Sequence, residues 1–169
     1  MITAEDLIKR FNMKPLPGEG GYYSETHRSS HTLSESSLPD NYSSDRSLST
    51  AIYYMLTPET KSLLHRLPTE EIFHFYLGDP VLMLHLYSDG SSNQVILGQD
   101  LNKGQSVQVL VPKDVWQGSY LLEGGQFAFM GTTMSPGFDF SDNEIGNRDD
   151  LIKFYPSQKK LIERLTDLY

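Results

Sequence analysis

The chain has 169 residues, of which 38% are hydrophobic and 11% aromatic, and its formal net charge is −8. This length suits one domain with a packed core, while the negative charge disfavours nucleic acids and anionic membranes as partners, because these bind clustered Lys and Arg. The chain contains no cysteine, which excludes disulfides and thiolate metal sites.

The first residues, MITAEDLIKRF, have neither the basic start nor the apolar run of a signal peptide. No apolar segment approaches the roughly 20 residues that a membrane-spanning helix needs, so we expect a cytoplasmic location. Thr3 can cap a short helix whose apolar side carries Leu7, Ile8 and Phe11. This helix must end before KPLPGEGG, because prolines and glycines break regular structure.

A strand-like segment, YYSETHR, comes next, and residues 28–47 then contain eight serines and few large apolar side chains. Long loops are uncommon inside compact domains, and some of them act as lids. The pattern therefore predicts a long loop, which is either a solvated, flexible excursion or a lid over a binding site.

Residues 48–133 carry short β-branched and aromatic segments separated by turn residues such as Asp89-Gly90 and Gly124-Gly125. Closely spaced short strands predict an antiparallel sandwich or barrel. Apolar residues then recur at helical spacing over about residues 147–168. Pro156 should divide this tail into two helices.

The segment that begins at His65 resembles the first motif of the cupin superfamily, a His-x-His followed by Glu and then by Gly. His65, Glu71 and Gly78 match, whereas Leu67 replaces the second histidine. PKDVWQ resembles the second motif, with Gln117 where a histidine belongs. Further stretches, including TAIYYML, EIFHFYLGDP and VPKDVWQG, are similar to a cupin branch of unassigned biochemical function.

The resemblance covers roughly residues 3–165 and implies a single cupin domain over residues 1–169. The implied fold is mostly β: a double-stranded β-helix, or jelly-roll, barrel over about residues 20–140, with short N-terminal and C-terminal helices. A ligand pocket inside the barrel and a homodimer are also implied. The GGYYSETHR segment favours the dimer as well, since an exposed strand edge invites pairing.

Strand alternation separates the candidate side chains by face. Glu71, Phe73 and Phe75 share one face, so Phe73 and Phe75 would line the pocket beside the carboxylate. His74 would then point away from His65, so these histidines and Glu71 would not form one triad.

The remaining histidines are weaker candidates. The opposite face from His85 carries Leu82, Leu84 and Leu86, which makes a better core. We therefore expect His85 to point outward or to lie in a contact between sheets. His27 and His31 flank the serine-rich loop and should be solvated.

A metal site is disfavoured, because Leu67 supplies no donor and the Gln117 amide is a poor ligand for transition metals. We expect no metal and no other cofactor. Two alternatives remain: a metal-dependent cupin enzyme, either an oxygenase or an isomerase, and a non-catalytic structural or storage-type cupin.

In a metal-free pocket, His65 can exchange a proton near neutral pH, and Glu71 can hold its tautomer or raise its pKa. These two are the catalytic candidates. Asp139 could be the acid partner of His65 or cap the SPGFDF turn. The ligand-binding candidates offer hydrogen-bonding groups or flat apolar surface: Gln117, Phe73, Phe75, Tyr53, Tyr54, Trp116 and Asp139.

This set resembles metal-independent cupin epimerases and isomerases of sugar nucleotides, in which a barrel histidine removes a proton next to a carbonyl. The expected partner is therefore a small molecule. The expected function is binding of a sugar-nucleotide-like or other polar ligand, with or without isomerase or epimerase activity.

Overall fold

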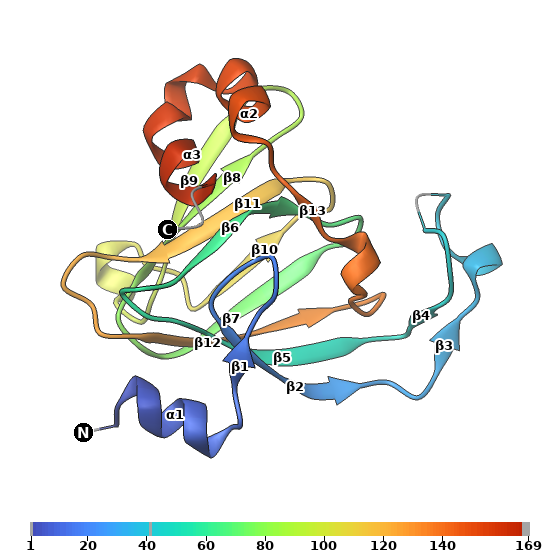
Figure 1. Ribbon diagram of the computed structural model, residues 1–169, viewed down its shortest axis with the longest axis horizontal. Helices are drawn as coiled ribbons and strands as arrows, with labels where there is room; N and C mark the ends of the chain where they lie inside the picture. Colours follow the sequence, from blue (N-terminus) through green and yellow to red (C-terminus); the bar gives the residue numbers. More distant parts are fainter. Residues whose placement is uncertain (1, 41, 167–169) are drawn as a thin grey trace.

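Two antiparallel β-sheets face each other in the computed structural model, which describes residues 2–40 and 42–166 (Figure 1). The strands that form them are β1 (Lys14–Pro15), β2 (Tyr22–Arg28), β5 (Thr50–Leu56), β6 (Lys61–Arg66), β7 (Glu71–Gly78), β8 (Val81–Leu86), β9 (Ser92–Leu97), β10 (Gln108–Val111), β11 (Trp116–Leu121), β12 (Ala128–Met134) and β13 (Glu144–Ile145). Within these residues one sheet has the order β1-β2-β5-β12-β7-β10 and the other the order β13-β6-β11-β8-β9. Neighbouring strands come from distant parts of the chain, as in a jelly roll. The predicted mostly β architecture is confirmed.

Short helices cover the outer faces of both sheets. Helix α1 (Ala4–Arg10) has the predicted Thr3 cap, and its Leu7 packs with Met55 and Phe129 outside the six-stranded sheet. Helices α2 (Arg148–Phe154) and α3 (Lys159–Thr166) lie over the five-stranded sheet, joined by the short helix η4 (Pro156–Gln158) (Figure 1). The last two residues of the predicted helical range, 167 and 168, lie outside the described residues. Among the described helices, none has the length and apolar character needed to cross a bilayer.

Strand β8 corrects one prediction from the sequence. Leu84 and Leu86 pack against the C-terminal helices on the outer face of their sheet, whereas Val81 and Met83 lie in the core between the sheets. Both faces of this strand are covered, so its leucine face did not identify the barrel interior. Because side chains alternate along a strand, His85 lies on the interior face with Met83.

The serine-rich segment is more regular than the predicted long loop. It contains the short helix η1 (Glu35–Ser37) and a pair of strands, β3 (Thr32–Leu33) and β4 (Arg46–Ser47), which extends beyond the side of the barrel (Figure 1).

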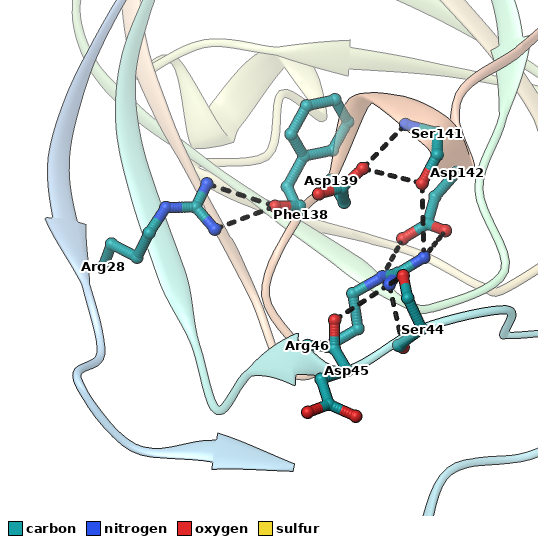
Figure 2. A network of polar contacts seen from close by, with 8 residues as sticks. All are labelled: Arg28, Ser44, Asp45, Arg46, Phe138, Asp139, Ser141 and Asp142. Atoms are coloured by element: carbon teal, nitrogen blue, oxygen red, sulfur yellow. Dashed lines mark hydrogen bonds and ion pairs between the residues drawn. The ribbon is translucent and has the colours of Figure 1, made fainter. Parts of the chain in front are cut away.

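Arg46 ties this excursion to the main body of the protein. Its Nε donates to Oδ2 of Asp142 at 2.7 Å, and its Nη1 donates to the carbonyl oxygen of Ser44 at 2.9 Å (Figure 2). The Tyr42 ring lies 5.4 Å from the guanidinium. Both side chains of the ion pair are almost fully covered, with exposed fractions of 2% and 7%.

Removing the Asp142 carboxylate would leave the Arg46 guanidinium covered and unpaired. The pair lies close beneath the surface, so we expect Asp142→Ala to lower the free energy of unfolding by about 2 kcal/mol, between the costs for exposed and deeply buried pairs. Urea denaturation measures this difference. In the matched control Glu144→Ala, the lost ion pair with Arg66 is solvent-exposed and the cost should stay below about 1 kcal/mol. Equal losses of unfolding free energy in the two variants would contradict the larger stabilisation assigned to the covered Arg46–Asp142 ion pair.

Candidate functional site

A cavity of about 390 Å³ lies against the inner face of the six-stranded sheet. This volume falls within the range of small-molecule sites. Its aromatic lining comes from Tyr23, Tyr54, Phe73, Phe138 and Phe140. The cavity therefore has flat apolar walls, and its charged groups fall into two sets that differ in exposure.

Two of the charged groups are buried and the others are exposed. Glu19 and Glu71 are 8% and 7% exposed, and we call their part of the cavity the buried end. Lys14, Glu25 and Arg28 are exposed, and we call their part the open end. Arg28 is paired with Glu25 at 2.8 Å.

The three polar residues singled out by the cupin motifs come together at the buried end, where Glu71 belongs to the lining and His65 and Gln117 do not. Gln117 on β11 lies opposite His65 on β6 in the strand register. Its Nε2 donates to Oε2 of Glu71, at the start of β7, at 2.7 Å. A strand from each sheet thus supplies one partner of this buried hydrogen bond.

Glu19 completes the cluster and was not among the predicted site residues. Its Oε1 accepts from Ser62 Oγ at 3.0 Å, and its Oε2 lies 3.7 Å from His65 Nε2. The adjacent Gly20 has a φ of +99°, and a Cβ there would lie 2.3 Å from the carbonyl oxygen of Lys61. This close approach requires glycine. A glutamate directly before Gly20-Gly21 was the available sequence signal.

The hydrogen bonds of His65 fix its tautomer. Nδ1 lies 2.7 Å from the carbonyl oxygen of Leu63, which can only accept, so Nδ1 carries a hydrogen. In the neutral imidazole, Nε2 therefore keeps its lone pair and points toward Glu19. The carboxylate beside His65 is thus Glu19, and not Asp139, for which the sequence left open the roles of acid partner and turn cap.

The buried end shifts the pKa of Glu71 above its ordinary value of 4.5. Loss of hydration is the main cause and the nearby charge of Glu19 is the second, while His65, Thr132 and Gln117 oppose the shift. Glu71 therefore holds its proton to a higher pH than an exposed glutamate. This is the behaviour expected of a group that exchanges protons.

The carboxylates reach the cavity, but the imidazole does not. Glu19 and Glu71 belong to the lining, whereas His65 and Gln117 lie behind them and are 1% and 2% exposed. A ligand in this cavity would therefore touch the carboxylates, and His65 would act on it through them.

Two predicted ligand-binding aromatics line the cavity. Phe73 forms part of one wall, and Tyr54 another, with its hydroxyl donating to the carbonyl oxygen of Gly20 at 2.9 Å. Phe75 is buried in the core between the sheets and is not part of the lining.

Three other predicted ligand-binding residues lie away from the cavity. Tyr53 alternates to the outer face, where its ring centroid is 4.6 Å from that of Phe11. Trp116 packs with the C-terminal helices, beneath the guanidinium of Arg66 at 4.6 Å. Asp139 accepts from the backbone N–H of Ser141 at 2.9 Å and so caps a turn, the alternative role that the sequence left open. These corrections follow from strand alternation and turn chemistry.

The other histidines differ in their exposure to solvent. His74 lies on the outer face, 2.9 Å from Thr133 Oγ1, as predicted. His85 is buried instead of pointing outward, lies opposite Gln117 in the register, and has no hydrogen-bond partner for Nε2 among the described residues. Exposed positions for His27 and His31 confirm the prediction for them.

The side chains present do not fit the usual cupin metal centre. In the described part of the chain, no three His, Cys, Asp or Glu side chains are grouped so that they could hold an ion. Leu67 offers no donor, and the Gln117 amide turns its Nε2 toward Glu71. A catalytic metal typically needs three protein ligands, which this set does not supply.

Arg28 contacts the backbone of a segment that forms one wall of the cavity. Its Nη1 and Nη2 each donate to the carbonyl oxygen of Phe138 at 3.1 Å (Figure 2). Arg46 and Asp142 anchor the same loop a few residues later (Figure 2). The position of the Phe138 ring therefore depends on two arginines near the two ends of the serine-rich segment, Arg28 at the end of β2 and Arg46 on β4.

The amino-acid sequence is similar to a protein family and to a yeast protein. The family described as Cupin superfamily (DUF985) matches residues 5–146. The uncharacterized protein YML079W of Saccharomyces cerevisiae is 31% identical over 154 residues, which are 86% of this chain and 76% of that protein.

Solved structures of other proteins are similar to this chain over nearly its whole length. A hypothetical protein from Leishmania major has a TM-score of 0.86 and 32% identity, with coverage of 97% of this chain and 98% of the other. Protein SO0799 from Shewanella oneidensis has a TM-score of 0.85 and 31% identity over 99% of each chain. A mutant of Bacillus subtilis oxalate decarboxylase OxdC has a TM-score of 0.52 and 14% identity over 91% of this chain and 37% of that one, which shows a shared fold alone.

The raised pKa of Glu71 predicts a pH-dependent stability difference. A carboxyl whose pKa rises on folding contributes stability below its ordinary value of 4.5 and loses it as the pH rises through the folded-state pKa. As the pH rises above 4.5, the free energy of unfolding of Glu71→Gln should therefore increase relative to that of the wild type. Urea denaturation from pH 4 to pH 8 measures the difference, and a constant difference would contradict the burial effect. Exposed Glu123→Gln is the control and should run parallel to the wild type.

His85 predicts the opposite trend, because burial lowers its pKa to about 4. An unfolded imidazole titrates near 6.5, so protons bind the unfolded chain preferentially between these values. The wild-type protein should lose about 3 kcal/mol of stability through His85 as the pH falls through this window. The variant His85→Gln should lack that loss, and identical pH profiles for the two proteins would argue against it.

Proposed function

Since this chain belongs to the Cupin superfamily (DUF985), as its sequence predicted, we propose that it binds a small polar molecule inside its barrel and acts as a metal-independent isomerase or epimerase. The ligand is sugar-nucleotide-like or another polar molecule of similar size. One observation carries the proposal: a buried carboxyl group that holds its proton unusually well, Glu71, lines a cavity of about 390 Å³.

Glu71 is the proposed catalytic residue. In its ionised form it takes a proton from a carbon next to a carbonyl group, which leaves a planar enolate. In its protonated form it returns the proton to a neighbouring atom, which gives an isomer, or to the other face of the same carbon after the enolate has turned over in the cavity, which gives an epimer. Such a step only relocates a hydrogen, so it needs no oxidant or reductant. Proton transfer by a positioned side chain typically contributes about 10²- to 10⁴-fold in rate.

The residues behind Glu71 are proposed as positioning residues. Gln117 orients the carboxylate by donating to Oε2, and His65, whose Nε2 lies 3.7 Å from Glu19 Oε2, opposes the rise in the pKa of Glu71. This differs from the role predicted from the sequence, in which His65 itself takes the proton. The change follows from its position behind the carboxylates rather than in the cavity lining.

Association into a homodimer and a cytoplasmic location also remain proposals. The dimer is favoured by the edge of β2, which pairs with β1 only at Tyr22 and Tyr23. Beyond Tyr23 no other described strand covers that edge. Exposed strand edges of this kind invite pairing with a second chain.

The proposal is tested in two steps. Sugar nucleotides and other small polar molecules are first screened for a rise in melting temperature, since a ligand at 100 times its Kd adds roughly 2.7 kcal/mol of stability. Each compound that binds is then incubated with the protein in D₂O, and deuterium incorporation into its carbon skeleton is followed by NMR. We expect incorporation with wild type and a loss of roughly 100-fold or more in Glu71→Gln.

The control for this experiment is Glu123→Gln. Glu123 is exposed and does not line the cavity, so this variant should incorporate deuterium at the wild-type rate. A screen in which no compound shifts the melting temperature would favour a storage-type cupin. Exchange that continues unchanged in Glu71→Gln would contradict the assigned catalytic residue.

A further inference from the structure

We infer that the ligand enters this cavity with a cationic hydrogen-bond donor first, an ammonium, amidinium or guanidinium group, and that this group contacts Glu19 and Glu71 together. The inference deepens the proposed function and rests on it in one respect: the same cavity must be the ligand site. It does not depend on proton transfer taking place there.

The hydrogen-bond donors around the buried end are already used within the protein. The amide Nε2 of Gln117 donates to Glu71, and the hydroxyl of Ser62 donates to Glu19. His65 Nδ1–H donates to the carbonyl oxygen of Leu63, and the Tyr54 hydroxyl donates to that of Gly20. An incoming acceptor group, such as a phosphate or a carboxylate, would find none of these donors free.

Two of the groups left over at the buried end are acceptors, although the buried Ser119 hydroxyl and His85 Nε2 also lack partners among the described residues. Glu19 Oε2 lies 3.7 Å from His65 Nε2, beyond the length of a normal hydrogen bond. The carbonyl oxygen of the Gln117 side chain is buried and has no hydrogen-bond partner among the described residues. Buried polar atoms are nearly always satisfied in folded proteins, so this unpaired acceptor behind Glu71 adds to the excess of acceptors at the buried end.

The charges at the buried end favour a cationic ligand group, as the unused hydrogen-bond acceptors do. Glu19 and Glu71 are both buried, and the charge of Glu19 raises the pKa of Glu71, while His65 opposes this shift. Two carboxylates taken out of water are costly unless they are paired. A cationic group that reaches both would compensate them, whereas an anionic group would add a third negative charge.

The cavity walls suit the same kind of ligand. Tyr23, Tyr54 and Phe73 line it, and aromatic faces attract cations as well as flat apolar bodies. The cations at the open end do not cancel this preference. Arg28 is paired with Glu25, and Lys14 is exposed, 5.2 Å from the Tyr23 ring.

Three probes of nearly the same shape test the inference: benzamidine is cationic, benzamide is neutral and benzoate is anionic. Calorimetry with the full chain at pH 7.5 should give benzamidine at least tenfold tighter binding than benzamide, and no binding of benzoate. Benzamidine affinity should fall at least tenfold in Glu19→Gln and in Glu71→Gln. It should be unchanged in Glu123→Gln.

A measurement on the wild type guards against variants that fail to fold. Benzamidine stays protonated throughout the acidic and neutral range, whereas Glu71 gains its charge only above an ordinary carboxyl pKa, with Glu19, His65 and Tyr54 as its charged or titratable neighbours. Its affinity should therefore rise between pH 5 and pH 7.5. A flat or falling profile would overturn the inference.

Other outcomes separate this inference from the proposed function. Ile52 lines the cavity, and Ile52→Trp should fill part of it and abolish binding. If benzoate or benzamide binds as well as benzamidine and Ile52→Trp removes that binding, the cavity is the ligand site but the inferred cation is wrong. Failure of all three probes overturns the inference, while the separate screen with sugar nucleotides decides the proposed function.

Discussion

The burial of two carboxylates, Glu19 and Glu71, constrains the rest of this barrel. Removing either charge from water costs free energy unless partners replace the lost hydration. Gln117 and Ser62 supply hydrogen bonds, and His65 supplies an imidazole beside both carboxylates. The glycine turn after Glu19 and the register between β6 and β11 hold these groups at the required distances.

The sheets and helices make this burial possible. The inner faces of the two sheets form an apolar core, and helices α1, α2 and α3 cover apolar residues on the outer faces. Four of the buried polar residues line the cavity: Glu19, Thr50, Glu71 and Thr132. Three atoms on β8 and β11, Gln117 Oε1, His85 Nε2 and Ser119 Oγ, remain without hydrogen-bond partners in the described structure.

Two arginines connect the cavity wall to the serine-rich excursion. Arg28 donates to the backbone of Phe138, whose ring lines the cavity, and Arg46 pairs with Asp142 in the same loop (Figure 2). The excursion therefore shares its anchors with a wall of the cavity. Its shape follows from ion pairing and from the β3–β4 pair, because it contributes few large apolar side chains to the core.

The amino-acid sequence determined the mostly β class and the helical ends, because strand alternation and helical spacing are local properties. The jelly roll and the meeting of His65, Glu71 and Gln117 were implied by the resemblance to cupin motifs. The sequence also placed His74 on the outside. Tertiary structure alone decided that Glu19, not Asp139, faces His65, and that Trp116 and Tyr53 lie outside the cavity. It also buried His85, since helices cover the leucine face of β8 and no local pattern distinguishes a barrel interior from a helix-covered exterior. Contacts between segments distant in the chain depend on register and layer packing, which the spacing of residues along one strand does not encode.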